Sequence, residues 1–235
     1  ETHWSYSGDD GPERWAELDS DYALCDSGVE QSPIDLRNAT VVEGASLEPE
    51  YRAGAVSIAR NEHAVDLLDN GHTIQITYDA GSTIEADGVI YELVQFHFHA
   101  PSEHTVEGQH YPMEMHFVHQ AEDGALAVVG VFVAEGEHSE VFQGLLDESP
   151  SQSGAERHLE GVGLDVDAFV PEQTEYFRYM GSLTTPPCSE GVRWIVLPNP
   201  LVVSAEQVAA FERLLHDNNR PLQPIGERQL DLIQY

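Results

Sequence analysis

The stretch Leu93-Val94-Gln95-Phe96-His97-Phe98-His99 alternates polar and apolar side chains and predicts the β-strand that decides the fold. Successive side chains of a strand point to opposite faces. We expect one face to carry Gln95, His97 and His99. The other face, with Val94, Phe96 and Phe98, is expected to pack into a core. Imidazole is the commonest metal ligand at neutral pH, so the polar face predicts half of a metal site.

A second alternating stretch, residues 113–119, supplies a third histidine. Alternation places Glu114, His116 and Val118 on one face. The distance in sequence from His99 to His116 suits two neighbouring strands joined by a loop. Three neutral imidazoles leave one tetrahedral position open, which is the catalytic arrangement of zinc. Gln95 and Glu114 each lie two residues from a histidine on the same face and are expected to accept a ring N–H. The spacing alone leaves surface or structural histidines open.

The rest of the chain predicts a single, predominantly β domain over residues 1–235. Short alternating runs occur at 56–58, 64–67 and 73–78, with turn signals at 69–71, 79–81 and 86–88. The histidine strand, 112–120 and the strongly apolar run 125–133 follow, and strands at this spacing favour a mostly antiparallel sheet. Helices are expected after the capping box at 204–207 and over 140–146, with Ser139 as its cap. The first forty residues read as an irregular wrap with aromatic anchors.

The charge balance is extreme. The chain has 42 acidic residues against 10 basic ones, all Arg, and a formal net charge of −32. Such a polyanion is repelled by nucleic acid and by anionic membranes, and no apolar run is long enough to span a membrane. The acids are scattered, which favours a solvated surface suited to concentrated salt over a dedicated Ca²⁺ site. The chain begins at Glu1, and we expect that any leader has been removed.

The two cysteines, Cys25 and Cys188, are far apart in the sequence and form no C-x-x-C motif. Their positions alone leave a disulfide and two buried thiols open.

Several motifs, in order, resemble the α-class carbonic anhydrases almost from end to end. They are 3–6 (HWSY), 31–35 (QSPID), 95–99 (QFHFH), 102–104 (SEH), 114–119 (EMHFVH), 181–188 (GSLTTPPC), 194–197 (WIVL) and 218–224 (NNRPLQP). The resemblance implies a central, twisted, mostly antiparallel sheet with a conical cavity and a few short helices. It also implies reversible hydration of CO2 to bicarbonate and a proton by a zinc-bound hydroxide.

Carried over by position, the resemblance assigns a role to each residue of the site. His97, His99 and His116 would bind Zn²⁺, and Gln95 and Glu114 would orient them. Thr184 would accept a hydrogen bond from the hydroxide and donate one to Glu103, and His104 would be a buried partner of Glu103. His72 would carry the product proton to a proton-accepting buffer, with water ordered by Tyr6 and Gln75. The CO2 pocket would consist of Val118, Val128, Leu183, Thr185 and Trp194.

The resemblance also bears on location and assembly. Cys25 and Cys188 lie where exported members place one disulfide, so a secreted or periplasmic protein is implied, in an oxidising compartment. Both a monomer and a homodimer stay open. The alternative functions are a non-catalytic binding protein and an acidic biomineral-matrix protein on the same fold. Ala100-Pro101, Gln75 and Asn219 depart from frequent family residues, and none of them is a metal ligand.

Overall fold

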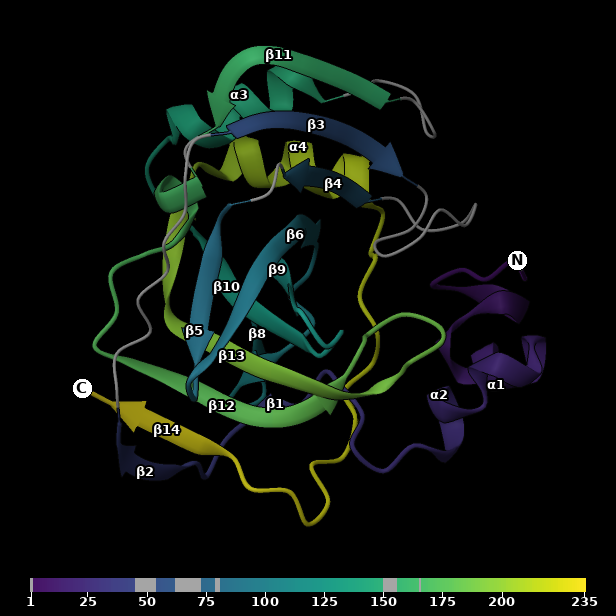
Figure 1. The fold of residues 1–235 in the computed structure, drawn as a ribbon. Helices are drawn as coiled ribbons and strands as arrows, with labels where there is room; N and C mark the ends of the chain where they lie inside the picture. Colours follow the sequence, from purple (N-terminus) through teal and green to yellow (C-terminus); the bar gives the residue numbers. More distant parts are fainter. Residues whose placement is uncertain (1, 45–53, 62–72, 79–80, 150–155, 165) are drawn as a thin grey trace.

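The computed structural model of the chain describes residues 2–44, 54–61, 73–78, 81–149, 156–164 and 166–235 (Figure 1). His72, the run expected at 64–67 and the turn expected at 69–71 lie outside these residues.

Strands dominate the described part of the chain. Eleven of its strands form one sheet, in which β10–β13 and β14–β2 pair in parallel and the other pairs are antiparallel, so the expected mostly antiparallel sheet is confirmed. The order is β11 (Glu156–Leu164), β3 (Gly54–Asn61), β4 (Thr73–Tyr78), β6 (Val89–His99), β9 (Met113–Ala121), β10 (Leu126–Glu135), β13 (Glu190–Val203), β12 (Glu175–Ser182), β14 (Asp231–Gln234) and β2 (Thr40–Glu43), with β5 (Thr83–Ala86) beside β6.

A small second sheet and short helices complete the fold. The small sheet consists of β1 (Asp35–Leu36), β7 (Thr105–Val106) and β8 (Gln109–His110). The helices are α1 (Trp15–Leu18), α2 (Leu24–Ser27), α3 (Glu140–Glu148) and α4 (Ala205–Leu215), with 3-10 turns η1 (Gly8–Asp10), η2 (Pro12–Arg14), η3 (Ser20–Tyr22) and η4 (Val166–Phe169). None of the helices in the described ranges has the length and apolar character needed to cross a membrane.

The two expected helices are confirmed with their caps. The Ser204 side chain accepts from the backbone of Gln207, and the Gln207 side chain accepts from Ser204 in return, which completes the capping box. Ser139 caps α3 by accepting from the backbone N–H of Phe142. Both helices bury their apolar stripes in the main core, where Phe211 of α4 stacks on Phe98 of β6 with ring centroids 5.1 Å apart.

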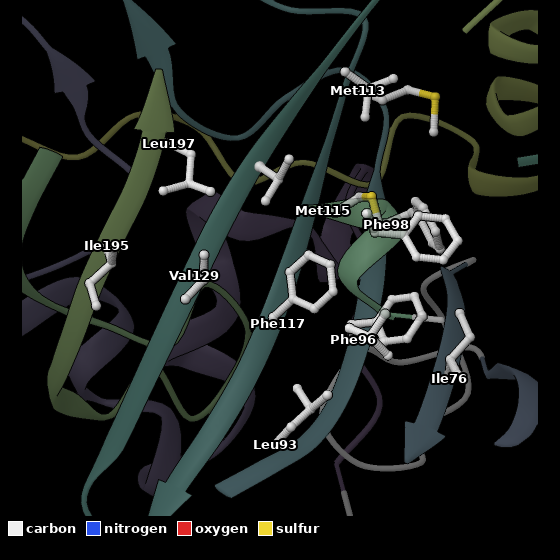
Figure 2. Packing of buried hydrophobic residues seen from close by; sticks show 14 of the residues in the cluster. Ile76, Leu93, Phe96, Phe98, Met113, Met115, Phe117, Val129, Ile195 and Leu197 are labelled. Carbon is white, nitrogen blue, oxygen red and sulfur yellow. The ribbon is translucent and has the colours of Figure 1, made fainter. Parts of the chain in front are cut away.

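The apolar face of β6 and β9 forms the main core. Phe96 stacks on Phe117 with ring centroids 5.1 Å apart, and Met113, Met115 and Phe98 extend the cluster along both strands (Figure 2). Burying side chains of this size contributes about 1.5–3 kcal/mol each. This packing fixes the register, because a slip by one residue would turn the apolar side chains to the opposite face.

The predicted parity of β6 is wrong at Val94. The register with β9 shifts between Leu93 and Gln95, so Val94 is the extra residue of a β-bulge and is 42% exposed. Leu93, at 2% exposure, takes the core position beside Phe96. Beyond the bulge the alternation holds as far as His99.

The opposite face of the sheet packs a second apolar cluster that includes Val118, Val128 and Trp194. The N-terminal wrap, defined here as residues 2–34, packs at one side of the molecule (Figure 1). Trp4, Trp15 and Tyr22 anchor it as expected, around the disulfide between Cys25 and Cys188, which the structure contains.

His119 is a fully buried histidine on the core face of β9. Its Nδ1–H donates to the carbonyl of Phe117 at 2.9 Å. Burial lowers the pKa of His119 to about 4, although hydrogen bonds to backbone carbonyls oppose the shift. The neutral imidazole is therefore part of the folded core.

This burial predicts an acid-sensitive fold. The folded pKa of His119, about 4, lies below the unfolded value of 6.5, so as the pH falls the unfolded chain takes up the proton first. The contribution of neutral His119 to stability is complete above pH 6.5 and is lost as the pH falls to 4, a change of about 3 kcal/mol. Urea unfolding should show that the wild-type free energy of unfolding falls by about this much more than that of His119→Gln, whose amide cannot be protonated. Parallel pH profiles for the two chains would contradict it.

Candidate metal centre and active site

The pairing of β6 with β9 brings the three predicted histidines together. His97 lies directly opposite His116 in the register, and His99 lies opposite Glu114. The ring centroids of the three imidazoles are 5.0, 5.3 and 4.5 Å apart, and each residue is at most 3% exposed. One ligand atom from each ring lies within 4.8 Å of the others. The predicted half-sites therefore meet in one buried cluster.

A hydrogen bond at one nitrogen of each ring determines which nitrogen is free. The pairs are His97 Nδ1 with Gln95 Oε1 at 2.8 Å, His99 Nδ1 with the Asn218 carbonyl at 2.7 Å, and His116 Nε2 with Glu114 Oε1 at 2.9 Å. These oxygens accept, so each paired nitrogen carries the proton. The lone pairs are then left on Nε2 of His97, Nε2 of His99 and Nδ1 of His116.

The surroundings keep two of the imidazoles neutral. Burial lowers the pKa of His97 well below its usual value, and the neighbouring His99 and His116 lower it further. Burial also lowers the pKa of His99, with Glu103 acting in the opposite direction. Neutral imidazole is the form that binds a metal.

The donor set fits a zinc ion. His99 Nε2 is buried and has no hydrogen-bond partner, although an unsatisfied buried polar atom costs about 1–3 kcal/mol. Three imidazole nitrogens match the ligand set of catalytic zinc, which keeps a fourth position open. His97, His99 and His116 are thus the residues that would hold the ion.

A second cluster of His104, Glu114 and His116 is a hydrogen-bonded network. Both oxygens of Glu114 are occupied: Oε1 accepts from His104 Nδ1 at 2.7 Å and from His116, and Oε2 accepts the backbone N–H of His104 at 2.8 Å. Burial alone would raise the pKa of Glu114, but the two histidines hold that pKa well below its usual range. Glu114 therefore orients His116 as an ionised carboxylate.

His104 has a different partner from the one expected. Its side chain contacts Glu114 and, through Nε2, the hydroxyl of Tyr179 at 2.7 Å, whereas Glu103 was the predicted partner. Consecutive side chains diverge here, so Glu103 turns towards His99 and His116, with Oε2 3.6 and 3.8 Å from their ligand nitrogens. His104 thus holds the carboxylate of Glu114 in place by hydrogen bonds.

Glu103 and Thr184 both lie buried in the described structure. Glu103 Oε1 accepts the backbone N–H of Arg220 at 2.8 Å, and its Oε2 has no hydrogen-bond partner. The expected hydrogen bond from Thr184 to Glu103 is not formed in this structure. The relay through Thr184 stays a prediction.

The residues expected in the CO2 pocket gather on one side of the histidines. Val118, Val128, Leu183 and Trp194 belong to a single apolar cluster. The Trp194 ring lies 4.8 Å from that of His116, and its Nε1–H donates to the Ser182 carbonyl at 2.9 Å. Thr185 is buried, and its Oγ1 has no hydrogen-bond partner.

Gln75 and Tyr6, the two residues expected to order water, lie in surroundings that differ from each other. Gln75 on β4 lies opposite His97 in the register, and its Oε1 is buried without a hydrogen-bond partner. Tyr6 packs edge-on against Trp4 and Trp15, with ring centroids 5.4 and 5.9 Å away. Its pKa is raised well above the usual value, first by burial and then by the charge of Glu103.

Sequence reasoning missed two contributors to the centre. Asn218 acts through its backbone carbonyl, which carries no signature in the side-chain pattern. Gly130 lies opposite His116 on β10, where a Cβ atom would come within 3.0 Å of Glu114 Oε1. A glycine in a strand next to polar residues is the signal that could have indicated this close approach.

The fold and the site define a class: β-sheet proteins with a buried cluster of three histidines able to hold a metal ion. The family model described as eukaryotic-type carbonic anhydrase matches residues 10–233. The chain belongs to this family, the α-class carbonic anhydrases.

Relatives and solved structures agree with this assignment. A carbonic anhydrase of Klebsiella pneumoniae is 43% identical over 231 residues, which is 97% of this chain and 89% of the relative. One from Nostoc is 40% identical over 226 residues, covering 96% and 84%. The α-carbonic anhydrase of Thermovibrio ammonificans, solved with the inhibitor sulfanilamide, superposes with a TM-score of 0.90 at 41% identity, over 98% of this chain and 99% of that one.

The Gln95–His97 hydrogen bond predicts a measurable contribution to zinc affinity. Gln95→Leu removes the acceptor of the Nδ1–H, so the proton can move to Nε2 and block the ligand atom. Competition with a chelator should show zinc affinity about 10–100-fold lower than in the wild type. Gln120→Leu, at an exposed position on β9, is the matched control and should bind zinc as the wild type does. Equal affinities for both variants would contradict the role of Gln95.

Proposed function

We propose that this chain catalyses the reversible hydration of CO2 to bicarbonate and a proton, at a zinc ion held by His97, His99 and His116. The observation that carries the proposal is the convergence of three buried imidazoles, each with one nitrogen left free by its hydrogen bond. Relatives that cover nearly the whole chain are named carbonic anhydrase.

The histidines and their hydrogen-bond acceptors would preorganise the metal-binding site. Gln95, Glu114 and the carbonyl of Asn218 hold the rings so that the free lone pairs face one another before an ion arrives. Held by these residues, zinc would supply Lewis-acid chemistry, which in carbonic anhydrases themselves lowers the pKa of water to about 7. The chain's own contribution is the geometry and the dry surroundings of the site.

The apolar cluster beside His116 suits the substrate. Carbon dioxide has no net dipole, so a wall of Val118, Val128, Leu183 and Trp194 can receive it without competing for the polar groups of the site. Thr185, two residues after Leu183 of this wall, offers a buried hydroxyl without a hydrogen-bond partner. Confinement next to the histidines would place the carbon for attack, which is catalysis by proximity.

Thr184 and Glu103 would orient the reacting oxygen. Glu103 is wholly buried and has one oxygen without a partner, which suits an acceptor for the Thr184 hydroxyl. A hydroxyl that donates to Glu103 can accept only from the reacting water. That arrangement would aim a lone pair of the water at the substrate carbon.

Neither alternative function is favoured. A non-catalytic binding protein on this fold has no need for three metal ligands together with Glu103 and Thr184, and the chain has all five. An acidic biomineral-matrix protein would be expected to carry a dense acidic segment, whereas the acids here are scattered.

The disulfide and the acidic composition suit an exported enzyme that works in concentrated salt. We infer a secreted or periplasmic enzyme, supported by the bond between Cys25 and Cys188. The net charge of −32 without a single Lys supports adaptation to salt, because ions screen the repulsion among the carboxylates. The CO2 hydration assay run in molar NaCl tests the salt adaptation, since loss of activity or precipitation there would oppose it.

Removing the metal tests the proposed function. We expect the zinc-loaded chain to hydrate CO2 in a stopped-flow assay, the chelator-treated chain to be inactive, and added zinc to restore the rate. His97→Ala should hold less zinc and be inactive, because it lacks one of the three ligands. His138→Ala, at an exposed position before α3, should behave as the wild type. Full turnover by a chain shown to be free of metal would refute the proposal.

The proton released by CO2 hydration must also leave the active site. His72 is proposed, from its position in the sequence, to pass the product proton to buffer, since an imidazole titrates near neutral pH. His72→Ala should slow turnover by about 100-fold in dilute buffer, and added imidazole should restore the rate. A rate that is unchanged in dilute buffer would remove His72 from the proton path.

A further inference from the structure

Arg220 is a buried cation at 1% exposure, in a chain whose charges otherwise lie mostly at the surface. Its guanidinium donates to Gln31 Oε1 and to the Ser32 carbonyl, both at 2.8 Å, and to the Cys25 carbonyl at 2.9 Å. The guanidinium also lies over the Trp15 ring, 5.6 Å from its centroid. Every one of these partners belongs to the N-terminal wrap.

All three acceptors of the Arg220 guanidinium are neutral. Burial lowers the pKa of Arg220 to about 10, and the charge of Glu103 opposes that shift, so the side chain stays charged at neutral pH. Buried cations are rare unless they are paired with an acid, and an apolar side chain would fill the same volume without desolvating a charge. Packing alone therefore does not explain an arginine here.

The segment 218–220 also contacts the metal centre. Asn218 and the backbone of Arg220 form four hydrogen bonds to β6 and to the segment after it. These are His99 Nδ1 to the Asn218 carbonyl at 2.7 Å, Ala100 N–H to Asn218 Oδ1 at 3.0 Å, Asn218 Nδ2 to the Phe98 carbonyl at 2.9 Å, and Arg220 N–H to Glu103 Oε1 at 2.8 Å.

The wrap is itself firmly held. The Gln31 amide donates to the Cys188 carbonyl at 3.0 Å and to Glu190 Oε1 at 3.1 Å, and the disulfide joins Cys25 to Cys188. The Arg220 guanidinium thus donates hydrogen bonds to two residues that are themselves fixed: Cys25, through its carbonyl, and Gln31.

We propose that Arg220 is a positioning residue for the metal centre: its guanidinium fixes residues 218–220 to the disulfide-bonded wrap, and that segment in turn holds His99 and Glu103 in the geometry that the metal requires. The guanidinium donates its hydrogen bonds to the wrap and is not one of the proposed metal-binding groups. It acts through the Asn218 carbonyl, which sets the His99 tautomer, and through the Arg220 backbone N–H, which binds Glu103 Oε1 and so leaves Oε2 near the histidines and open to the Thr184 hydroxyl.

The test compares zinc retention and cobalt spectra in three variants. Arg220→Met keeps the length of the side chain and removes its donors, and Arg220→Lys keeps the charge but cannot reach three separate acceptors in the fork geometry of arginine. Arg213→Met, at an exposed position on α4, is the matched control. We expect zinc loss to a chelator to be about 10-fold faster or more in Arg220→Met, intermediate in Arg220→Lys and unchanged in Arg213→Met. The visible spectrum of the cobalt-substituted Arg220→Met protein should depart from that of the wild type.

A merely structural role gives a different result. If Arg220→Met folds, melts at a lower temperature and yet keeps the wild-type rate of zinc loss and cobalt spectrum, the proposal is overturned. If Arg220→Met does not fold, Gln31→Leu, which removes one acceptor and leaves the arginine in place, must show faster zinc loss, and wild-type retention overturns the proposal.

This inference rests on the proposed zinc site. A wild-type chain that binds no zinc would overturn both, whereas a zinc-binding wild type with indifferent Arg220 variants would overturn the positioning role alone.

Discussion

The register of β6 against β9 is the constraint on which the rest of the structure depends. With His97 opposite His116, the apolar residues of both strands meet in the main core and the polar ones meet at the metal centre. The stacked pair of Phe96 and Phe117 stabilises this register, because a shift by one residue would expose the core and bury the histidines in it. The packing of one face therefore sets the geometry of the other.

Hydrogen bonds to the three histidines then determine which nitrogen of each ring can bind a metal. Without its acceptor, each imidazole could carry the proton on either nitrogen, and three crowded rings would not present lone pairs to one point. An unsatisfied buried atom such as His99 Nε2 costs about 1–3 kcal/mol, whereas zinc binding in structural sites releases roughly 10 kcal/mol or more. Zinc bound at this site would therefore offset the cost of preorganisation by a wide margin. The buried Arg220 extends the same arrangement outward to the wrap.

Much of the sheet and of the ligand cluster could be predicted from side-chain alternation, because every second residue of a strand with one buried face points into the core and is apolar. The prediction was wrong at Val94, because a bulge adds a residue without changing the composition of the strand. It was also wrong about the partner of His104, since motif order says which residues are near the site but not which way consecutive side chains turn. The Asn218 carbonyl could not be predicted, because any residue at that position would supply the same atom.

The outer hydrogen bonds determine the nitrogens at which the proposed zinc ion would bind. Crystallography of the zinc-loaded chain, with anomalous scattering at the zinc edge, would locate the ion and its ligand atoms. We predict one ion per chain, bonded to Nε2 of His97, Nε2 of His99 and Nδ1 of His116 at about 2.0–2.1 Å. An ion bound through the opposite nitrogen of any of these rings, or an ion at the His104–Glu114 network instead, would show that the outer hydrogen bonds do not select the metal ligands.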